Sequence, residues 1–168
     1  MTQLPWHDYS AEETADDLFS LVGTHRTDSL VVAFETALGK KAATLGLDAL
    51  TQPERDVLAI EALEREVNNG GYSQFFVNSS NEFAAQIVDA LRRIGCPRIA
   101  AVTERALSAL PTGTPLKPDA LVAAMETEDP SRDAELEECD SAYYAAREDV
   151  ATALLHYLQR HRESVRLS

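Results

Sequence analysis

The sequence predicts an all-α protein, a compact multi-helix bundle that ends in a long C-terminal helix. Apolar residues recur at steps of three and four in every periodic segment, which is the spacing of one helix face. Ser or Thr stands three residues before Glu at several segment starts, the pattern of a capping box. No apolar–polar alternation of convincing length is present to indicate a strand.

The first part of the chain, residues 1–50, predicts two helices. Ser10 and Glu13 form a capping box that starts the first helix, and Gly23 suits the position just after its end. Asp28 can cap the second helix, whose apolar stripe stops near Gly46.

The middle part, residues 51–110, predicts three helices. The first starts at the capping box of Thr51 and Glu54 and must end at Asn69-Gly70-Gly71, because each glycine in a helix interior costs about 1 kcal/mol. The other two run from Ser79 to Gly95 and from Pro97 to Leu110, with Pro97 in the first turn, where its missing N–H costs little.

The last part, residues 118–162, follows a proline-rich break that could separate two subassemblies. Pro118 starts a short helix. Ser131 can cap a long helix that carries an unbroken apolar stripe to about residue 162. We treat the three parts as segments of a single helical domain, which the 168 residues are long enough to form.

The charge of the protein is acidic and unevenly distributed. The 15 Lys and Arg residues stand against 28 Asp and Glu, a net charge of −13. Residues 1–17 carry −5 and residues 119–149 carry −9, whereas residues 18–118 are almost neutral at −1. Direct binding to nucleic acid or to an anionic membrane is therefore disfavoured, because both would repel the protein.

The sequence predicts a cytoplasmic protein. No apolar run approaches the roughly 20 residues that span a bilayer, and the N-terminus lacks the basic and apolar regions of a secretory signal. Cys96 and Cys139 do not make a disulfide framework, and their neighbours lack metal-ligand spacing.

Catalytic motifs are absent from the sequence. There is no phosphate-binding loop, dinucleotide fingerprint, zinc-protease motif or nucleophile elbow. His156 and His161 would lie about 140° apart around a helix, which suits one metal ion poorly. We expect a non-enzymatic protein without metal or cofactor, although acid–base roles for Glu64 and Glu66 stay open.

The helix predicted after Ser131 carries a row of acidic residues on the side away from its apolar stripe. On a helical wheel, five positions fall within about 80° of one another: Asp133, Glu137, Asp140, Tyr144 and Glu148. Steps of three or four residues advance about 4.5–6 Å, comparable with the roughly 3.4 Å per phosphate of one DNA strand. The partner-binding residues that we predict are Glu126, Glu128, Asp129, Asp133, Glu137, Asp140 and Glu148. The alternative is an acidic surface that serves solubility.

A second candidate site is the corner around Asn69-Gly70-Gly71. Its glycines allow the chain to reverse sharply after a helix, and amides nearby can satisfy backbone groups that the turn leaves open. The polar positions of this corner are Glu66, Asn68, Asn69, Gly70, Gly71, Gln74 and Asn78. Either the corner is an internally satisfied structural turn or it forms a polar ligand pocket.

The same segment resembles the signature of an all-helical bacterial family, a domain of unknown function named for a DNA-mimic protein. The similar residues are Glu66-Val-Asn68-Asn69-Gly70-Gly71-Tyr72-x-Gln74-Phe75-Phe76-x-Asn78-Ser79-Ser80, followed by Ala90-Leu91-x-x-Ile94-Gly95. The resemblance extends from about Pro53 to Leu110. It implies a compact helical fold and a homodimer, and in the family's naming member carboxylates imitate DNA phosphates and occupy a DNA-binding repressor.

These observations predict a non-enzymatic acidic protein that binds a basic partner, in particular a DNA-binding transcription regulator. Two alternatives remain. The same acidic surface would suit an immunity-type inhibitor of a toxin nuclease. The polar corner would suit a small-molecule-binding protein or an enzyme.

Overall fold

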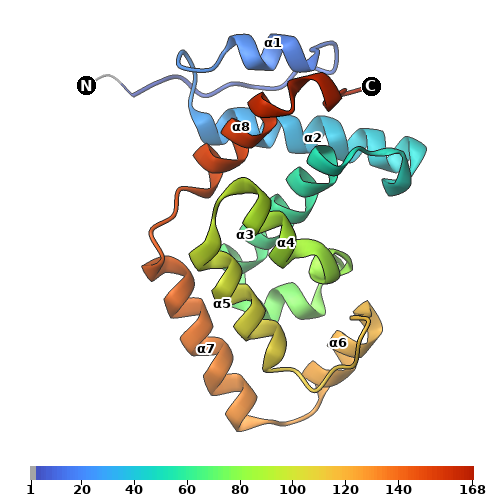
Figure 1. The fold of residues 1–168 in the computed structure, drawn as a ribbon, viewed down its shortest axis with the longest axis vertical. Helices are drawn as coiled ribbons and strands as arrows, with labels where there is room; N and C mark the ends of the chain where they lie inside the picture. The colour runs from blue at the N-terminus through green and yellow to red at the C-terminus, as the bar shows by residue number, and fades with distance from the viewer. Residues whose placement is uncertain (1–2) are drawn as a thin grey trace. The chain divides into compact units, whose positions relative to one another are not determined.

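The all-α class is confirmed. The computed structural model describes residues 3–168, which form eight α-helices and three short 3-10 helices and contain no strand beyond an isolated bridge between Val22 and His25 (Figure 1). Contacts within the chain divide the fold into two compact units. The first unit comprises the residues up to Glu61 together with those from Asp149 onward, and the second comprises Ala62–Glu148.

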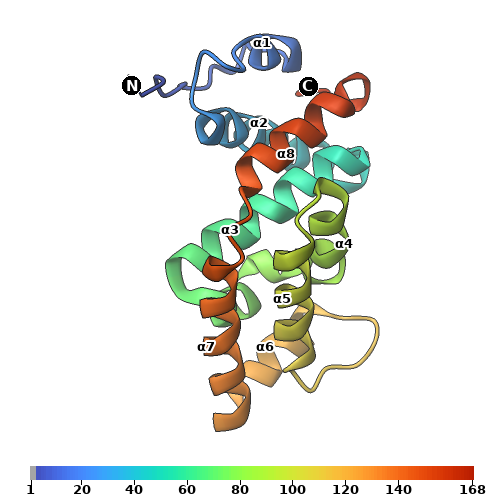
Figure 2. The ribbon, with the colours of Figure 1, turned by 60° about the vertical axis from the view of Figure 1, so that its left-hand side comes forward.

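The first unit packs its helices around α2. Its elements are α1 (Ala15–Ser20), α2 (Thr27–Leu45), η1 (Leu47–Ala49), the first turns of α3 (Gln52–Val77), α8 (Val150–Arg160) and η3 (Arg162–Ser164). Helix α8 lies against α2, and α1 contacts the same helix (Figure 2). Apolar contact holds these layers together, since the rings of Phe19 and Phe34 are both buried with centroids 5.0 Å apart.

A buried ion pair attaches the C-terminal segment to this unit. The ammonium of Lys41 donates to both carboxylate oxygens of Glu54, at 3.0 and 2.9 Å, and Glu54 is fully buried. The backbone N–H of Arg166 donates to the same carboxylate at 2.7 Å. A buried carboxylate needs such donors to offset its desolvation, so the segment around Arg166 is part of the fold.

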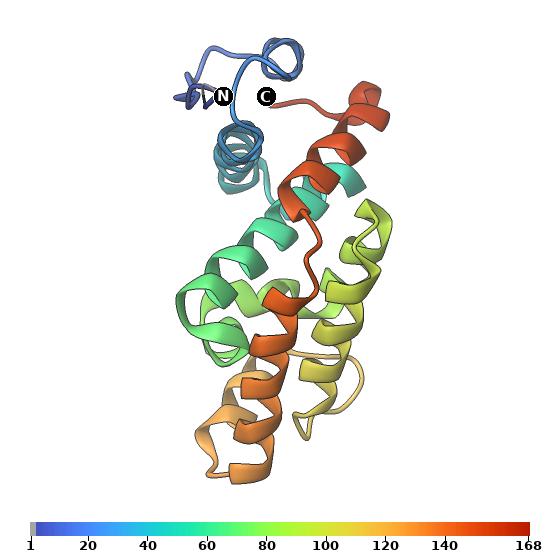
Figure 3. The same ribbon diagram turned by 90° about the vertical axis from the view of Figure 1, so that its left-hand side faces the viewer.

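The second unit is a helical layer in which α5 lies between α4 and α7 (Figure 1). Its elements are the remainder of α3, η2 (Ser79–Phe83), α4 (Ala84–Ile94), α5 (Pro97–Ser108), α6 (Pro118–Glu126) and α7 (Pro130–Ala145). Figure 3 shows α7 running beside α5. Large side chains fill the centre of the unit, among them the fully buried Tyr72, Phe75, Phe76, Ile87, Leu91 and Ile99.

Several predicted helix boundaries are confirmed and others are wrong; Asp28, for example, lies within the first turn of α2, whose N-cap is Arg26. Pro97 and Pro118 open α5 and α6, and Gly95 ends α4 in the left-handed conformation. The first helix does not start at Ser10, because α1 begins at Ala15 with Thr14 as its N-cap. Thr14 and Asp17 form the capping box instead, and the pair at Ser10 forms only a turn ahead of the helix.

The single helix predicted from Ser131 to about residue 162 is also wrong, since the structure has two helices there. Helix α7 starts at Pro130, with Asp129 as its cap, and ends at Ala145. Arg147 then takes a left-handed φ of 52°, and Asp149 caps the new helix α8 by accepting from the N–H of Thr152 at 3.0 Å. The apolar stripe continues across the break between α7 and α8 because both helices have a buried apolar face. The periodicity of the sequence alone therefore does not reveal the break.

Candidate functional site

The turn after the first part of α3 depends on its glycines, above all on Gly71. Gly70 is extended (φ −164°) and Gly71 is left-handed (φ 77°), so the helix is interrupted where the sequence predicts its end. A Cβ on Gly71 would lie 2.2 Å from a carboxylate oxygen of Asp140. A Cβ on Gly70 would lie 2.2 Å from the side-chain oxygen of Gln74. Conformation and space therefore both exclude larger residues at Gly71.

Glu66 is the centre of the polar corner. Its buried carboxylate accepts hydrogen bonds from Gln74 Nε2 at 2.7 Å, Asn78 Nδ2 at 2.8 Å and Ser80 Oγ at 2.8 Å. Burial alone would raise the pKa of Glu66, but these three donors together outweigh it and lower the pKa below its ordinary value. The corner therefore holds a carboxylate anion that its own side chains solvate.

The remaining polar residues of the corner are not gathered around one cavity. The side-chain amide of Asn68 donates to the backbone carbonyl of Glu64 at 2.7 Å, and Asn69 and Gly70 are exposed. The amides of Gln74 and Asn78 point to Glu66. These contacts hold the two parts of α3 at the turn, which is the geometry of the structural alternative that the sequence left open.

Two side chains of α7 connect that helix to the glycine turn. Asp140 accepts from the backbone N–H of Tyr72 at 2.8 Å, and the hydroxyl of Tyr144 donates to the carbonyl of Val67 at 3.1 Å. Burial raises the pKa of Asp140, the hydrogen bond from Tyr72 partly offsets this, and the charge of Glu137 adds to the rise. Asp140 thus supports the turn, although the sequence placed it among partner-binding residues.

Of the seven acidic residues predicted to bind a partner, two cap helices. Asp129 accepts from the N–H groups of Ser131 and Arg132, at 3.1 and 3.0 Å, at the start of α7. Glu148 accepts from the N–H groups of Arg98 and Ile99, at 3.0 and 2.9 Å, at the start of α5. A helix N-terminus carries a partial positive charge, so both carboxylates are partly compensated.

The other four of the seven, besides Asp140, are exposed and form what we call the acidic face: Glu126, Glu128, Asp133 and Glu137. Within the described part of the chain, Glu126, Glu128 and Glu137 show no hydrogen bond or ion pair. Asp133 pairs with the guanidinium of Arg132 at 2.6 Å, and that guanidinium also donates to the carbonyl of Ala124 at the end of α6. Asp133 and Glu137 are four residues apart on α7 and share one side of it.

The structure therefore brings together only part of the predicted row of five. Asp133 and Glu137 lie on the exposed side of α7, and Tyr144 is exposed at its end. Asp140 is half-buried against Tyr72, and Glu148 lies beyond the last residue of α7.

Arg105 makes a charged connection between α5 and α7, with partners that the sequence does not identify. Arg105 donates to Glu135 and, at 2.6 Å, to Glu138. These two hydrogen bonds raise the pKa of Arg105, and the pKa of Glu135 is lowered by its bond to Arg105. The partners are 30 and 33 residues apart in the chain, so no local pattern predicts the pairing.

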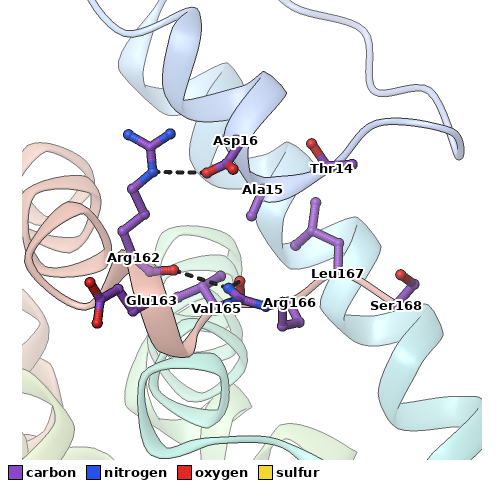
Figure 4. Close-up of a pocket in the computed structure, with 9 residues that line it drawn as sticks. All are labelled: Thr14, Ala15, Asp16, Arg162, Glu163, Val165, Arg166, Leu167 and Ser168. Atoms are coloured by element: carbon purple, nitrogen blue, oxygen red, sulfur yellow. Dashed lines mark hydrogen bonds and ion pairs between the residues drawn. The ribbon is translucent and has the colours of Figure 1, made fainter.

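A separate pocket lies in the first unit, between the residues that start α1 and the C-terminal segment (Figure 4). Arg162 Nε donates to Asp16 at 2.8 Å, and Arg166 donates to the carbonyl of Arg162 at 3.4 Å. Arg162 and Arg166 thus have partners within this pocket, and no residue predicted for a site lines it.

Three further observations bear on function. Among residues 3–168 no group of three or more His, Cys, Asp and Glu side chains is arranged to hold a metal ion. None of the helices in that range combines the length and the apolar character needed to cross a membrane. Both cysteines are buried, and burial raises the pKa of the Cys139 thiol, which disfavours a reactive thiolate.

The chain matches the model of a known protein family. A family model described as DMP19-like protein matches residues 48–161, which is more than half of the chain and includes the whole second unit. The match is longer than the stretch from Pro53 to Leu110 that carries the sequence resemblance. No curated protein matches the chain.

Proposed function

The chain belongs to the DMP19-like family, and from this premise we propose that it is a non-enzymatic, DNA-mimic-type protein whose acidic face binds a basic, DNA-binding partner. The observation that carries the proposal is a set of exposed carboxylates without internal partners, Glu126 at the end of α6, Glu128 in the loop that follows and Glu137 on α7. They belong to residues 119–149, which have a net charge of −9. Charges that the fold does not use remain available to a partner.

Electrostatics supports a surface that competes with DNA. Asp133 and Glu137 are separated by about 6 Å along the axis of α7, a repeat similar in scale to that of backbone phosphates. The negative electrostatic field of residues 119–149 attracts basic proteins before contact and speeds their association. Since exposed charges are screened within about 10 Å at 0.1 M salt, binding should weaken as salt rises.

The helix-capping carboxylates have a different role in this proposal. Asp129 and Glu148 add to the negative field, but their oxygens already accept backbone N–H groups. We therefore assign direct contact with the partner to the acidic face and long-range attraction to the caps.

The polar corner supports this proposal by its internal contacts. Its donors Gln74, Asn78 and Ser80 are used on Glu66, so the corner positions α3 in the unit that carries the acidic face. A toxin nuclease remains the second kind of basic partner, because its nucleic-acid site would present the same chemistry to the acidic face.

A capture experiment followed by competition tests the proposal. The wild-type protein is used as bait in host lysate at 50 and 300 mM salt, beside the double variant Glu126→Lys/Glu137→Lys. The matched control, Asp8→Lys/Glu12→Lys, makes the same charge change at exposed residues of the first unit that show no partner among the described residues. Thermal unfolding verifies that both variants fold.

We expect one basic DNA-binding protein to be retained at 50 mM salt by the wild type and by the control, and lost with the Glu126/Glu137 variant. The purified chain should then displace that protein from its own DNA. Capture of a nuclease whose cleavage is inhibited would select the second kind of partner. Retention that is indifferent to salt and to both variants would overturn the proposal.

A further inference from the structure

Tyr144 is an exposed aromatic ring that the fold holds in one position. Its side chain is 56% exposed, yet its hydroxyl donates to the carbonyl of Val67 at 3.1 Å. Its ring also contacts the ring of Tyr143 edge-on, with centroids 5.7 Å apart and planes 82° apart. Exposed tyrosines normally sample several rotamers, whereas two independent contacts fix this one with much of its ring open to solvent.

Carboxylates lie along the same helix on the approach to this ring. Asp140 is one turn and Glu137 two turns before Tyr144, about 6 and 10.5 Å along the axis of α7. Ser141, three residues before Tyr144, is small and exposed, and it lines a surface hollow together with Glu137 and Arg105. The ring is therefore the end of a negatively charged strip, where a cation is attracted by charge and can then contact an aromatic surface.

Resting on the proposed function, we propose that Tyr144 is the aromatic anchor of the acidic face and that it receives an arginine side chain of the partner, stacked on the exposed ring. A guanidinium is planar and weakly hydrated, so it stacks on aromatic rings more readily than the compact, strongly hydrated ammonium of lysine. Because the ring is already immobilised, binding does not have to order it. Glu137 would take a second basic residue about 10 Å away, the distance between residues seven apart on a helix.

The proposal assigns distinct roles to charge and to the ring. The acidic face attracts arginine and lysine alike, with some advantage for arginine through paired hydrogen bonds to carboxylates. The stack at Tyr144 adds a preference for arginine over lysine. At an exposed site, such a stack corresponds to about a three- to fivefold gain in affinity.

The test uses two short peptides, hexa-arginine and hexa-lysine, titrated into the full chain at low salt while the Tyr144 ring resonances are followed by NMR. We expect both peptides to bind, with the arginine peptide tighter and causing the larger shift at Tyr144. Tyr144→Ala should reduce the arginine preference three- to fivefold and leave lysine affinity nearly unchanged. Glu137→Gln should weaken both peptides by similar factors.

Two control variants distinguish the effect of the Tyr144 ring on binding from an effect on folding. Trp6→Ala removes a 46% exposed aromatic of the first unit and should leave the arginine preference unchanged. Tyr144→Leu keeps an apolar side chain without a π-face and should behave as Tyr144→Ala, which guards against an unfolded alanine variant. An arginine preference that survives both Tyr144 variants would overturn this inference and leave the proposed function intact. Failure of either peptide to bind wild type at low salt would count against the acidic face itself.

Discussion

The carboxylate of Asp140 accepts a hydrogen bond from the backbone N–H of Tyr72 at 2.8 Å, immediately after the left-handed Gly71. This contact joins the acidic helix α7 to the glycine turn of α3. It also fills the space that a side chain at Gly71 would occupy. One residue of the charged helix therefore supports the glycine turn of α3, and its carboxylate is engaged in an internal hydrogen bond.

Gly71→Ala should destabilise the protein by about 3 kcal/mol. A left-handed conformation costs a non-glycine residue about 1–2 kcal/mol, and displacing Asp140 removes a hydrogen bond from a partly buried N–H, which costs about 1–3 kcal/mol more. Gly23→Ala is the matched control, since Gly23 has a φ of 83° but open space around its Cα. Gly23→Ala should therefore lose only the part of the free energy of unfolding that the left-handed conformation costs. Urea denaturation measures both, and equal losses would show that Asp140 moves aside without cost.

Asp140 should titrate above the ordinary aspartate range, and Glu137→Gln should lower its pKa. Burial raises the pKa of Asp140, and the charge of Glu137 raises it further, against the opposing hydrogen bond from Tyr72. Carboxyl ¹³C NMR across pH 3 to 7 follows the residue directly. Glu126→Gln, which removes an exposed charge at the end of α6, serves as the control. A pKa of Asp140 at or below the usual value near 3.9 would contradict the burial argument.

The raised pKa of Asp140 also fixes the sign of its effect on stability. The folded state holds this proton more tightly than the unfolded state does. The contribution of Asp140 to the free energy of unfolding is therefore complete below the unfolded pKa of about 3.9 and declines as pH rises through the folded pKa. Wild type should accordingly lose stability relative to Asp140→Asn as pH rises through this window.

Glu66 should show the opposite pH dependence. Burial disfavours its anion, but its hydrogen bonds from Gln74, Ser80 and Asn78 prevail and lower its pKa. Its contribution is thus present above the unfolded pKa of about 4.3 and is lost as pH falls through the folded pKa. Glu66→Gln should cost about 2–4 kcal/mol at pH 7, because an amide offers one acceptor where the carboxylate offers two.

The advantage of wild type over Glu66→Gln should shrink as the pH is lowered through the window just below 4.3. Chemical denaturation at several pH values measures it. Glu82→Gln, at an exposed residue of the same unit, is the control and should change stability by less than about 0.5 kcal/mol at every pH. A neutral Glu66→Gln would indicate that the donors of the corner find other partners.

Local chemistry made much of the fold predictable from sequence. Proline at a first turn and glycine after a last turn set boundaries without help from the rest of the chain, as at Pro97, Pro118 and Gly95. The glycine pair at the turn of α3 was predictable for the same reason. Near the N-terminus, Ser10 and Thr14 each head a possible capping pair, and the two pairs are four residues apart. Packing of the residues that follow Thr14 selects Thr14 as the cap of α1.

The candidate site was less predictable, because its residues acquire their roles from distant segments. A helical wheel places Asp140 on the side of α7 away from the apolar stripe but does not show that this side meets Tyr72, which is 68 residues earlier. Glu148 does not continue the helical row, because its carboxylate accepts from the backbone N–H groups of Arg98 and Ile99, about 50 residues earlier. Periodicity in the sequence predicts which face of a helix is apolar, whereas only the fold shows which segment packs against a given face.

Glu148→Ala should therefore behave as the loss of a helix cap and not as the loss of a surface charge. Its carboxylate receives the N–H groups of Arg98 and Ile99 in the first turn of α5 and interacts favourably with the positive end of that helix. We expect a loss of about 1 kcal/mol in the free energy of unfolding, of which Glu148→Gln should recover part through its side-chain oxygen. Glu137→Ala removes the same charge from the acidic face and should change stability by less than about 0.5 kcal/mol. Partner binding should respond in the reverse order, with Glu137→Ala the more damaging. Equal stability losses for the two alanine variants would show that Glu148 is a surface charge after all.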